Sequence, residues 1–260
     1  MKHPALSCLA LCLPFFASSA HAEDIMSILA RKAEAPSPLA PSSIDYTYTL
    51  TLDVKSREGK DLSEGQAVLR IDPTQPPGSR AQILSASDAE SEALQDFLKE
   101  IEDEDNTMEK QAEGFWCGPS DVDSQSDFSP DNFTVVSEDE SQAILRPNPD
   151  KLAELLMQSD ENADENGRKM MKKLLKRIEG DVTLSKPSGD MTGFSVRMTR
   201  PMTMMLVAKL KTMTVEQSCE LAPNGHYRIG VMDMNVEGKA LGSRFGQEIY
   251  MEISDLTPIP

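Results

Sequence analysis

The chain has 260 residues and a formal net charge of −17, with 43 acidic against 26 basic residues. A chain of this length can bury enough apolar surface to fold without a metal or a dense disulfide framework. The acidic balance argues against nucleic acid or an anionic membrane surface as the main partner, because both demand clustered Lys and Arg side chains.

Residues 1–22 have the layout of a cleavable secretory signal peptide. Lys2-His3 forms a short positive start, residues 5–20 are apolar apart from Ser and Pro, and Ala20-His21-Ala22 places small residues before the cleavage point. The apolar run is shorter than a spanning helix needs, and Glu23 follows it at once. We therefore expect a periplasmic or secreted protein with no integral membrane span in its mature form.

Two cysteines remain when the signal peptide, with Cys8 and Cys12, is removed. Cys117 and Cys219 then form one predicted disulfide with no cysteine left over, in a compartment that favours oxidation. This bridge would tie the middle of the chain to its last third, which favours one domain. Residues 115–120 also resemble a thioredoxin active site with Ser in place of the second Cys, but the acidic, polar flanks predict neither the strand nor the helix of such a site.

The first half of the chain predicts a helix, two or three strands and a second helix. Residues 23–43 are expected to form an N-terminal helix and a Pro/Ser linker, and residues 44–260 a single α+β domain. Alternation of apolar and polar residues predicts strands at 46–54 and 66–72, with a third at 82–84. Behind a capping box at residues 87–90, apolar residues at helical spacing predict an amphipathic helix from 94 to 101.

The middle of the chain mixes a long loop with short elements. Residues 102–130 are acidic and aperiodic and predict a loop, followed by short strands at 133–136 and 143–145. Asn148-Pro149 predicts the start of a helix, and residues 171–180 a second amphipathic helix. The basic face of this second helix is expected to be solvated; the alternative is a surface that docks on an acidic partner or on lipid headgroups.

The last third is rich in predicted strands. They fall at residues 182–184, 193–199, 202–216, 226–236 and 244–254, with turns at Pro223-Asn224-Gly225 and Glu237-Gly238. Consecutive strands joined by short turns imply antiparallel pairing. The predicted fold class is α+β, with a large curved antiparallel sheet or incomplete barrel and helices packed on one face.

The residues that usually carry catalysis or bind cofactors are scarce. His226 is the one histidine after residue 22, and no nucleophile motif or phosphate-binding glycine loop is present in the sequence. Asp121, Asp123 and Asp127 have a spacing suited to calcium, but Ser126 stands where an EF-hand needs Gly. We therefore predict no enzymatic activity, no catalytic residue, no cofactor and no metal site.

Methionine is unusually frequent in the last third of the sequence. The predicted ligand-binding residues are Met198, Met202, Met204, Met205, Met232 and Met234. Methionine is a flexible apolar side chain suited to varied hydrophobic partners, which favours a lipid or acyl chain as ligand. Thioether sulfur is also a soft ligand, so copper(I) binding is the competing interpretation.

The order of the predicted elements resembles a known family. An export signal, a short helix, two strands, helices inserted between strands and a long antiparallel run over residues 44–254 are similar to periplasmic lipoprotein carriers of the LolA/LolB type. The resemblance implies an incomplete barrel whose concave face holds acyl chains beneath helices. The leading functional hypothesis is thus a non-enzymatic envelope protein that binds a lipid, and the alternative is an envelope interaction or scaffold protein with a filled core and a protein partner.

Overall fold

The computed structural model of the chain describes residues 24–34, 46–76, 79–87, 91–102, 117, 129–149, 173–186, 188–203 and 208–259. The first half contains α1 (Ile25–Glu34), β1 (Tyr46–Glu58), β2 (Asp61–Ile71), β3 (Ala81–Ser87), α2 (Glu92–Glu102), η3 (Pro130–Asn132), β4 (Phe133–Glu138) and β5 (Gln142–Pro147). The second half contains β6 (Ile178–Ser185), β7 (Met191–Met198), β8 (Met202–Thr203), β9 (Ala208–Leu221), β10 (Tyr227–Ala240) and β11 (Ser243–Pro258).

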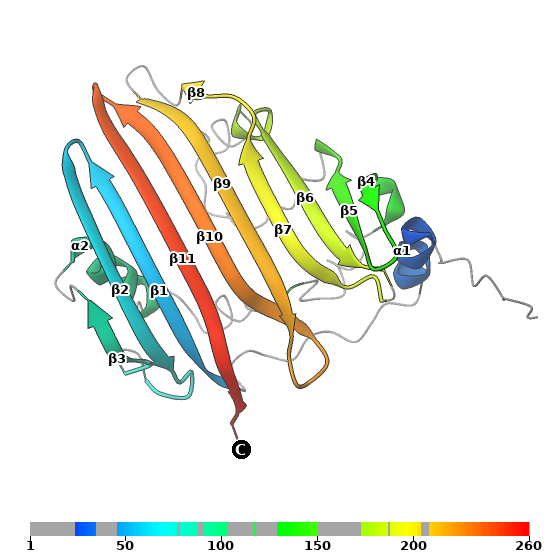
Figure 1. Ribbon diagram of the computed structural model, residues 1–260, viewed down its shortest axis with the longest axis horizontal. Helices are drawn as coiled ribbons and strands as arrows, with labels where there is room; N and C mark the ends of the chain where they lie inside the picture. Colours follow the sequence, from blue (N-terminus) through cyan, green and yellow to red (C-terminus); the bar gives the residue numbers. More distant parts are fainter. Residues whose placement is uncertain are drawn as a thin grey trace, which may run out of the picture.

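These strands form one antiparallel sheet of eleven strands (Figure 1). The strand order is β3-β2-β1-β11-β10-β9-β7-β6-β5-β4, and β8 pairs with β9 beside this path. The sheet is curved and is not closed into a barrel, since β3 and β4 lie at its two ends. The predicted large antiparallel sheet is therefore confirmed. The pairing of β1 with β11 brings the first and last strands together inside the sheet.

The register of the strands aligns one row of side chains across the sheet. Because side chains alternate between faces, residues that pair directly across strands lie on the same face. The row consists of Ala86, Ala67, Leu52, Met251, Met232, Gln217, Phe194, Val182, Leu145 and Val135. We call the face that carries this row the inner face. The outer face carries the neighbouring row Asp53, Tyr250, Asp233, Glu216, Ser195 and Asp181.

Helix α2 packs on the inner face at the β1–β2 end of the sheet. Leu94 is fully buried and, with Ala93, joins a cluster that includes Leu52, Val54 and Leu69. Each large side chain buried in such a cluster stabilises the fold by about 1.5–3 kcal/mol. Helix α2 therefore covers the inner face over this cluster of β1 and β2.

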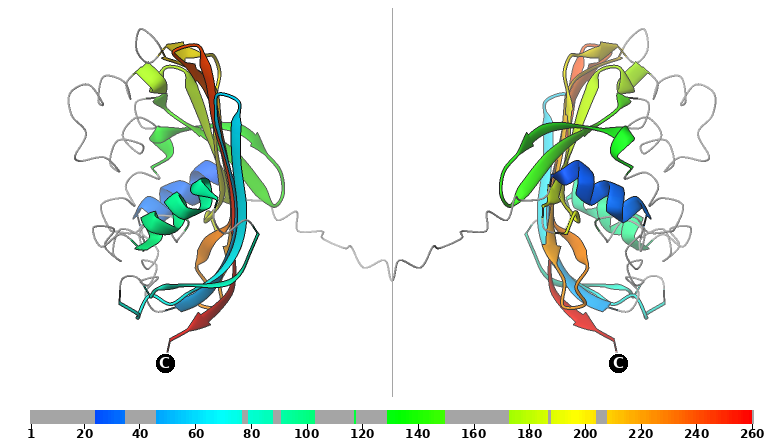
Figure 2. Two further views of the ribbon diagram at one scale, coloured as in Figure 1. Left: turned by 90° about the vertical axis from the view of Figure 1, so that its left-hand side faces the viewer. Right: turned by 90° about the vertical axis from the view of Figure 1, so that its right-hand side faces the viewer.

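Helix α1 packs on the inner face at the β4–β6 end. Its Ile25, Ile28 and Leu29 are buried in a cluster with Leu145 and Val182. Figure 2 shows α1 and α2 on the same side of the sheet. The apolar side of this short helix thus completes the core over β4, β5 and β6.

The start of α1 is fixed by a carboxylate from β4. Glu138 accepts a hydrogen bond from the Ile25 backbone N–H at 3.2 Å and forms an ion pair with the buried Lys186 at 2.8 Å. The hydrogen bond from Lys186, followed by that from Ile25, holds the pKa of Glu138 below its ordinary value of 4.5, although partial burial opposes this. A carboxylate at a helix N-terminus also satisfies backbone donors that lack a partner within the helix.

We expect Glu138→Gln to destabilise the protein by about 1 kcal/mol at neutral pH, the scale of a partly exposed charged hydrogen bond. Because folding lowers the pKa of Glu138, its contribution is present above pH 4.5 and is lost as the pH falls through the folded-state value. Urea unfolding measured from pH 7 to pH 3 should therefore show the variant and the wild type converging in acid. A difference in the free energy of unfolding that stayed constant over this pH range would contradict the role assigned to the Glu138 carboxylate.

Strand β6 replaces the end of a predicted helix. Residues 173–175 are helical, but the helix predicted for residues 171–180 is wrong beyond them, because β6 begins at Ile178. Ile178, Gly180, Val182 and Leu184 are buried at every second position, which is the period of a strand. Pairing with β7 supplies their backbone hydrogen bonds. The predicted loop at 102–130 and the helix from 148 lie mostly outside the described residues.

Two further predictions in the last third are corrected. The predicted strand 202–216 is two strands, since Met202 of β8 pairs antiparallel with Leu210 of β9. The turn predicted at Glu237-Gly238 lies within β10, and the chain turns at Leu241-Gly242, where both residues have positive φ. A two-residue hairpin turn needs this backbone shape, which Leu rarely adopts, so the sequence gives little sign of it. The turn predicted at Pro223-Asn224-Gly225 is confirmed, with Gly225 at φ +86°.

Gly238 in β10 leaves room for an aromatic ring from β11. It pairs with Phe245, and a Cβ at Gly238 would lie 2.1 Å from Phe245 Cζ and 2.8 Å from the Lys209 carbonyl oxygen. Gly246, also in β11, has no such conflict, since its nearest neighbour would be the Val236 carbonyl oxygen at 3.4 Å.

Gly238→Ala should therefore lower the free energy of unfolding by about 1–3 kcal/mol, the usual cost of an added methyl group in a packed position. Gly246→Ala is the matched control in the adjacent strand and should cost less than about 1 kcal/mol. Urea denaturation of both variants measures the difference. Equal effects would show that the ring of Phe245 moves aside freely.

Candidate functional site

The middle of the inner face is apolar but only half-buried. Met232 and Met234 of β10 lie between Met251 of β11 and Val215 of β9, and all four side chains are partly exposed. Elsewhere in the same row, Leu52 and Leu145 have no exposed surface, because they pack in the clusters with α2 and α1. In the described part of the chain, α2 contacts β1, β2 and β3, whereas α1 packs against β4, β5 and β6. We call the apolar region over β11, β10 and β9 the central patch.

Two hollows flank the central patch at one end of its strands. The larger, of about 630 Å³, lies between α2 and the strands β1 and β11, and its apolar lining includes Phe97, Phe245 and Ile249. The smaller, of about 410 Å³, extends toward Val236 of β10 and Lys211 of β9. The two share five lining residues, namely Ser56, Arg57, Leu62, Phe245 and Gln247. They therefore adjoin one another and lead from α2 to the edge of the central patch.

The predicted methionines do not all lie in one place. Met232 and Met234 lie in the central patch, while Met198 of β7 packs beside Met213 in a neighbouring cluster. Met202 is buried opposite Leu210 and so belongs to the core. Met204 and Met205 lie outside the described residues.

Sequence reasoning missed part of the central patch. Met251, Met213 and Val215 belong to it or border it, yet they were not among the predicted ligand-binding residues. Met213 and Val215 are two residues apart in β9, and Met251 occupies the same face of β11. The alternation of faces along these strands could therefore have identified all three once the pairing with β10 was known.

The described residues offer no arrangement of metal ligands. Within these residues no group of three or more His, Cys, Asp or Glu side chains is close enough to hold one ion. His226 lies in the turn between β9 and β10, where its backbone N–H donates to Asn224 Oδ1 at 3.0 Å.

Burial raises the pKa of Tyr48, which packs against the cluster of β1, β2 and α2, to about 12. This phenol is therefore neutral at physiological pH.

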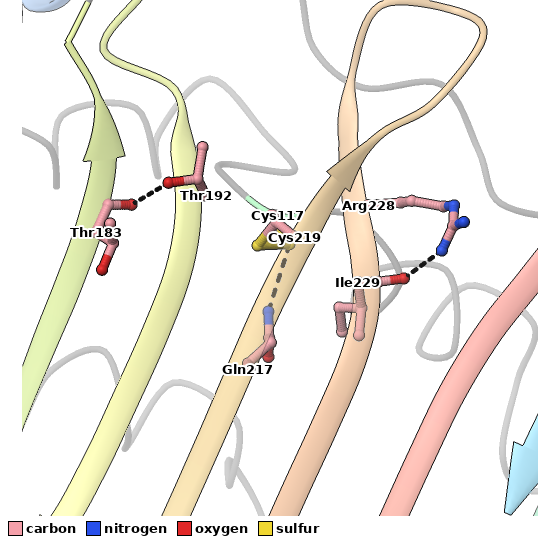
Figure 3. The surroundings of a disulfide bond; sticks show 7 residues. All are labelled: Cys117, Thr183, Thr192, Gln217, Cys219, Arg228 and Ile229. Atoms are coloured by element: carbon pink, nitrogen blue, oxygen red, sulfur yellow. Dashed lines mark hydrogen bonds between the residues drawn. A yellow bond between two sulfur atoms is a disulfide. The ribbon is translucent and has the colours of Figure 1, made fainter. Parts of the chain in front are cut away.

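A disulfide joins Cys117 to Cys219 of β9 beside the central patch (Figure 3). The Cys117 backbone N–H donates to the Tyr227 carbonyl oxygen at 2.9 Å, and Gln217 Nε2 donates to Cys117 Sγ at 3.4 Å. Cys219 stands two positions from Gln217 in β9 and therefore shares its inner face. The predicted pairing is present, so Cys117 carries no free thiol of the thioredoxin kind.

Arg228 holds the strand end next to this bridge. Its guanidinium is buried and donates to the carbonyl oxygens of Ile229 and Ile253, both at 2.8 Å, and to Glu220 Oε2 at 3.0 Å. Burial of a charge is tolerated when hydrogen bonds and an opposite charge satisfy it, as they do here. Arg228 thus links β9, β10 and β11 and is not available to a ligand.

Comparison with known proteins finds similar structures but no similar sequence. No protein-family model matches the chain, and no curated protein matches it. Similar solved structures include a DUF1329 family protein from Desulfovibrio piger, with 9% identity, a TM-score of 0.27, and coverage of 90% of this chain and 91% of that chain. They also include a LolA superfamily protein from Nitrosomonas europaea, with 11% identity, a TM-score of 0.25, and coverage of 92% and 95%.

The second of these proteins carries the name of the superfamily that the element order resembles. Both TM-scores are low, and neither likeness bears on what this chain binds. Among the described residues, no helix is long and apolar enough to cross a membrane.

The disulfide should make a large contribution to stability. It links residues 102 positions apart, and the removal of a native bridge of this kind costs about 2–5 kcal/mol. We expect the double variant Cys117→Ser with Cys219→Ser to have a free energy of unfolding lower by this amount, and so to unfold at a lower urea concentration. A reductant should destabilise the wild type and leave the double variant unchanged. Equal stability of oxidised and reduced wild type would contradict the prediction.

Proposed function

We propose that the protein is an exported, non-enzymatic component of the cell envelope that binds a lipid or another hydrophobic ligand on the central patch. The observation that carries the proposal is the contrast along a single row of the sheet: Leu52 and Leu145, which pack in the clusters with α2 and α1, have no exposed surface, whereas Met251 and Met232 between them remain partly exposed. Contiguous exposed apolar surface in a folded protein is typical of a ligand or partner site.

The side chains of the central patch suit a flexible apolar ligand. Methionine has an unbranched, polarisable side chain that adapts to different shapes, so Met232, Met234 and Met251 can pack against acyl chains of different length. Val215 and Ile253 add branched surface beside them. Burying apolar area contributes about 25 cal/mol per Å², so an acyl chain lying across three strands would bind without a directed polar contact.

Two features support the proposed export. Residues 1–22, which predict the signal peptide, lie outside the described residues, but the bond between Cys117 and Cys219 is typical of an oxidising compartment. The acidic charge suits a soluble carrier that does not adhere to anionic lipid surfaces.

The test is to isolate the exported protein, extract it with organic solvent and analyse the extract by mass spectrometry, and then to titrate the stripped protein with a fluorescent fatty acid. We expect a co-purified lipid and saturable binding. The double variant Met232→Gln with Met234→Gln should weaken binding about tenfold, because buried amides would face the acyl chain.

The matched control is Val231→Gln with Asn235→Gln, which alters the outer face of the same strand and should bind as the wild type does. Absence of both lipid and binding would contradict the proposal. If a stable protein partner co-purified in that case, the alternative of an envelope interaction protein would replace it.

A further inference from the structure

The hairpin between β10 and β11 carries the most exposed large apolar side chain among the described residues. Leu241 is 81% exposed at the tip of this hairpin and belongs to none of the hydrophobic clusters that the described residues form. Its backbone is left-handed, with φ +50°, and Gly242 follows at φ +86°. Gly or Asn usually occupies such a position, because Gly has no Cβ and the short side chain of Asn can hydrogen-bond locally. Neither the turn nor the core therefore accounts for a leucine here.

Directly behind this tip, three basic side chains stand side by side across three strands. Lys239 of β10 pairs with Arg244 of β11 on one side and with Lys209 of β9 on the other. We call these three residues the basic row. All three are exposed, and none forms an ion pair with a residue that the structure describes. Because like charges in directly paired positions destabilise a sheet, the basic row is a second feature of this hairpin that the fold does not explain.

The basic row is an exception within the sheet. In the described strands, no other Lys or Arg pairs directly with a second one. Several bases instead lie opposite acids, as in the pairs Lys55 with Glu248, Arg197 with Glu179 and Arg228 with Glu220. The chain has 43 acidic and 26 basic residues, and the three members of the row come together only through strand pairing. Net charge therefore gives no sign of this local cluster.

The β1–β2 hairpin lies beside the tip and extends its apolar surface. The Gly59 backbone N–H donates to the Arg244 carbonyl oxygen at 2.7 Å, which joins the two hairpins. Leu62 of this second hairpin is 53% exposed. The charges around its turn balance, with Arg57 and Lys60 against Glu58 and Asp61. The second hairpin thus adds an apolar side chain without cancelling the charge of the basic row.

The chain on the other side of the tip adds further positive charge. Residues 173–177 and 199–203 are held together by hydrogen bonds from Arg177 Nη1 to the Pro201 carbonyl oxygen at 2.7 Å and from Thr199 Oγ1 to the Arg177 carbonyl oxygen at 2.9 Å. The exposed charged residues of these two segments are Lys173, Lys176 and Arg200. Figure 1 shows β8 and both hairpins at the same end of the sheet. Positive charge therefore continues across this end.

We propose that this end of the sheet docks on the surface of a bilayer that contains anionic phospholipids, with Leu241 among the headgroups and the basic row on the phosphates. A strand rises about 3.4 Å per residue, so the basic row lies about 7–10 Å behind the tip. Amphipathic segments enter the headgroup region to a similar depth of about 5–10 Å. A single apolar tip backed by cations suits this fluid interface, which needs no shaped pocket, more than it suits a protein surface.

The acidic remainder of the molecule confines the contact to the tip. Glu237, the nearest acid of β10, lies about 14 Å from Leu241 along the strand, which exceeds the screening length of about 8 Å at physiological ionic strength. The outer face beyond it carries Asp233 and Glu216, which an anionic surface repels. The contact is therefore made end-on, is weakened by salt and is reversible, so the protein remains a soluble carrier.

Docking at this end goes beyond the proposed ligand binding and does not depend on it, although the two are compatible. Arg244 of the basic row lines the smaller hollow, which extends to Val236 at the edge of the central patch. A docked molecule would thus hold one end of this hollow against the bilayer, where a lipid ligand is taken up or released.

The test is co-sedimentation of the exported protein with vesicles of phosphatidylcholine alone or of phosphatidylcholine mixed with phosphatidylglycerol. The protein should bind the mixed vesicles only, and added salt should release it. Lys239→Gln with Arg244→Gln should weaken binding about twentyfold, since each Lys or Arg near an anionic surface contributes about fivefold. Leu241→Asn keeps every charge and should weaken binding about tenfold, because it removes the apolar side chain from the interface.

The matched control is Arg70→Gln with Arg80→Gln, which makes the same change in net charge at the opposite end of the strands, near the β2–β3 turn. It should bind the mixed vesicles as the wild type does. Equal binding to the two kinds of vesicle, unchanged binding by the tip variants, or an equal loss in the control would overturn the inference. If wild type bound no vesicles but held an acidic protein that both tip variants released, a protein partner would replace the bilayer.

Two further measurements separate docking from folding and from ligand binding. Leu241→Asn should unfold at the same urea concentration as wild type or a higher one, because Asn suits the left-handed turn. Unfolding at a lower concentration would show that Leu241 supports the fold and would overturn the inference. This variant should also bind the fluorescent fatty acid as wild type does, so a failure of vesicle binding alone leaves the proposed function standing.

Discussion

The cross-strand register of β1, β11, β10 and β9 is the constraint on which the other features depend. Leu52 pairs with Met251, Met251 with Met232, and Met232 with Gln217. A shift of one residue in any of these pairings would exchange the two faces of that strand and bring acidic side chains such as Asp233 onto the inner face. The docking of α2, the position of the disulfide and the lining of the hollows all follow from this alignment.

The side chains that stabilise the fold and those proposed to bind a ligand lie in different parts of the inner face. The clusters beneath α1 and α2 bury the largest apolar side chains completely, so the ends of the sheet supply most of the packing free energy. The central strands contribute through their long ladders and through the hydrogen bonds of Arg228. Partly exposed methionines can therefore persist at the centre, because the fold does not depend on sealing them.

Local patterns in the sequence were sufficient to predict many of the helices and strands, but not to predict how the strands pair. Alternation predicts β1, helical spacing predicts α2, and the count of cysteines predicts the bridge of Cys117 with Cys219. The pairing of β1 with β11 joins residues about two hundred positions apart, and no local signal encodes it.

The errors have a common physical cause. Ile178 continues both the helical spacing of residues 171–178 and the alternation of β6, and Gly180 suits either the end of a helix or a strand. The ladder with β7 decides between the two structures. Glu237-Gly238 has the composition of a turn, but the space that Gly238 leaves is filled by Phe245 from the next strand. In each case a residue of the neighbouring strand supplies the deciding contact.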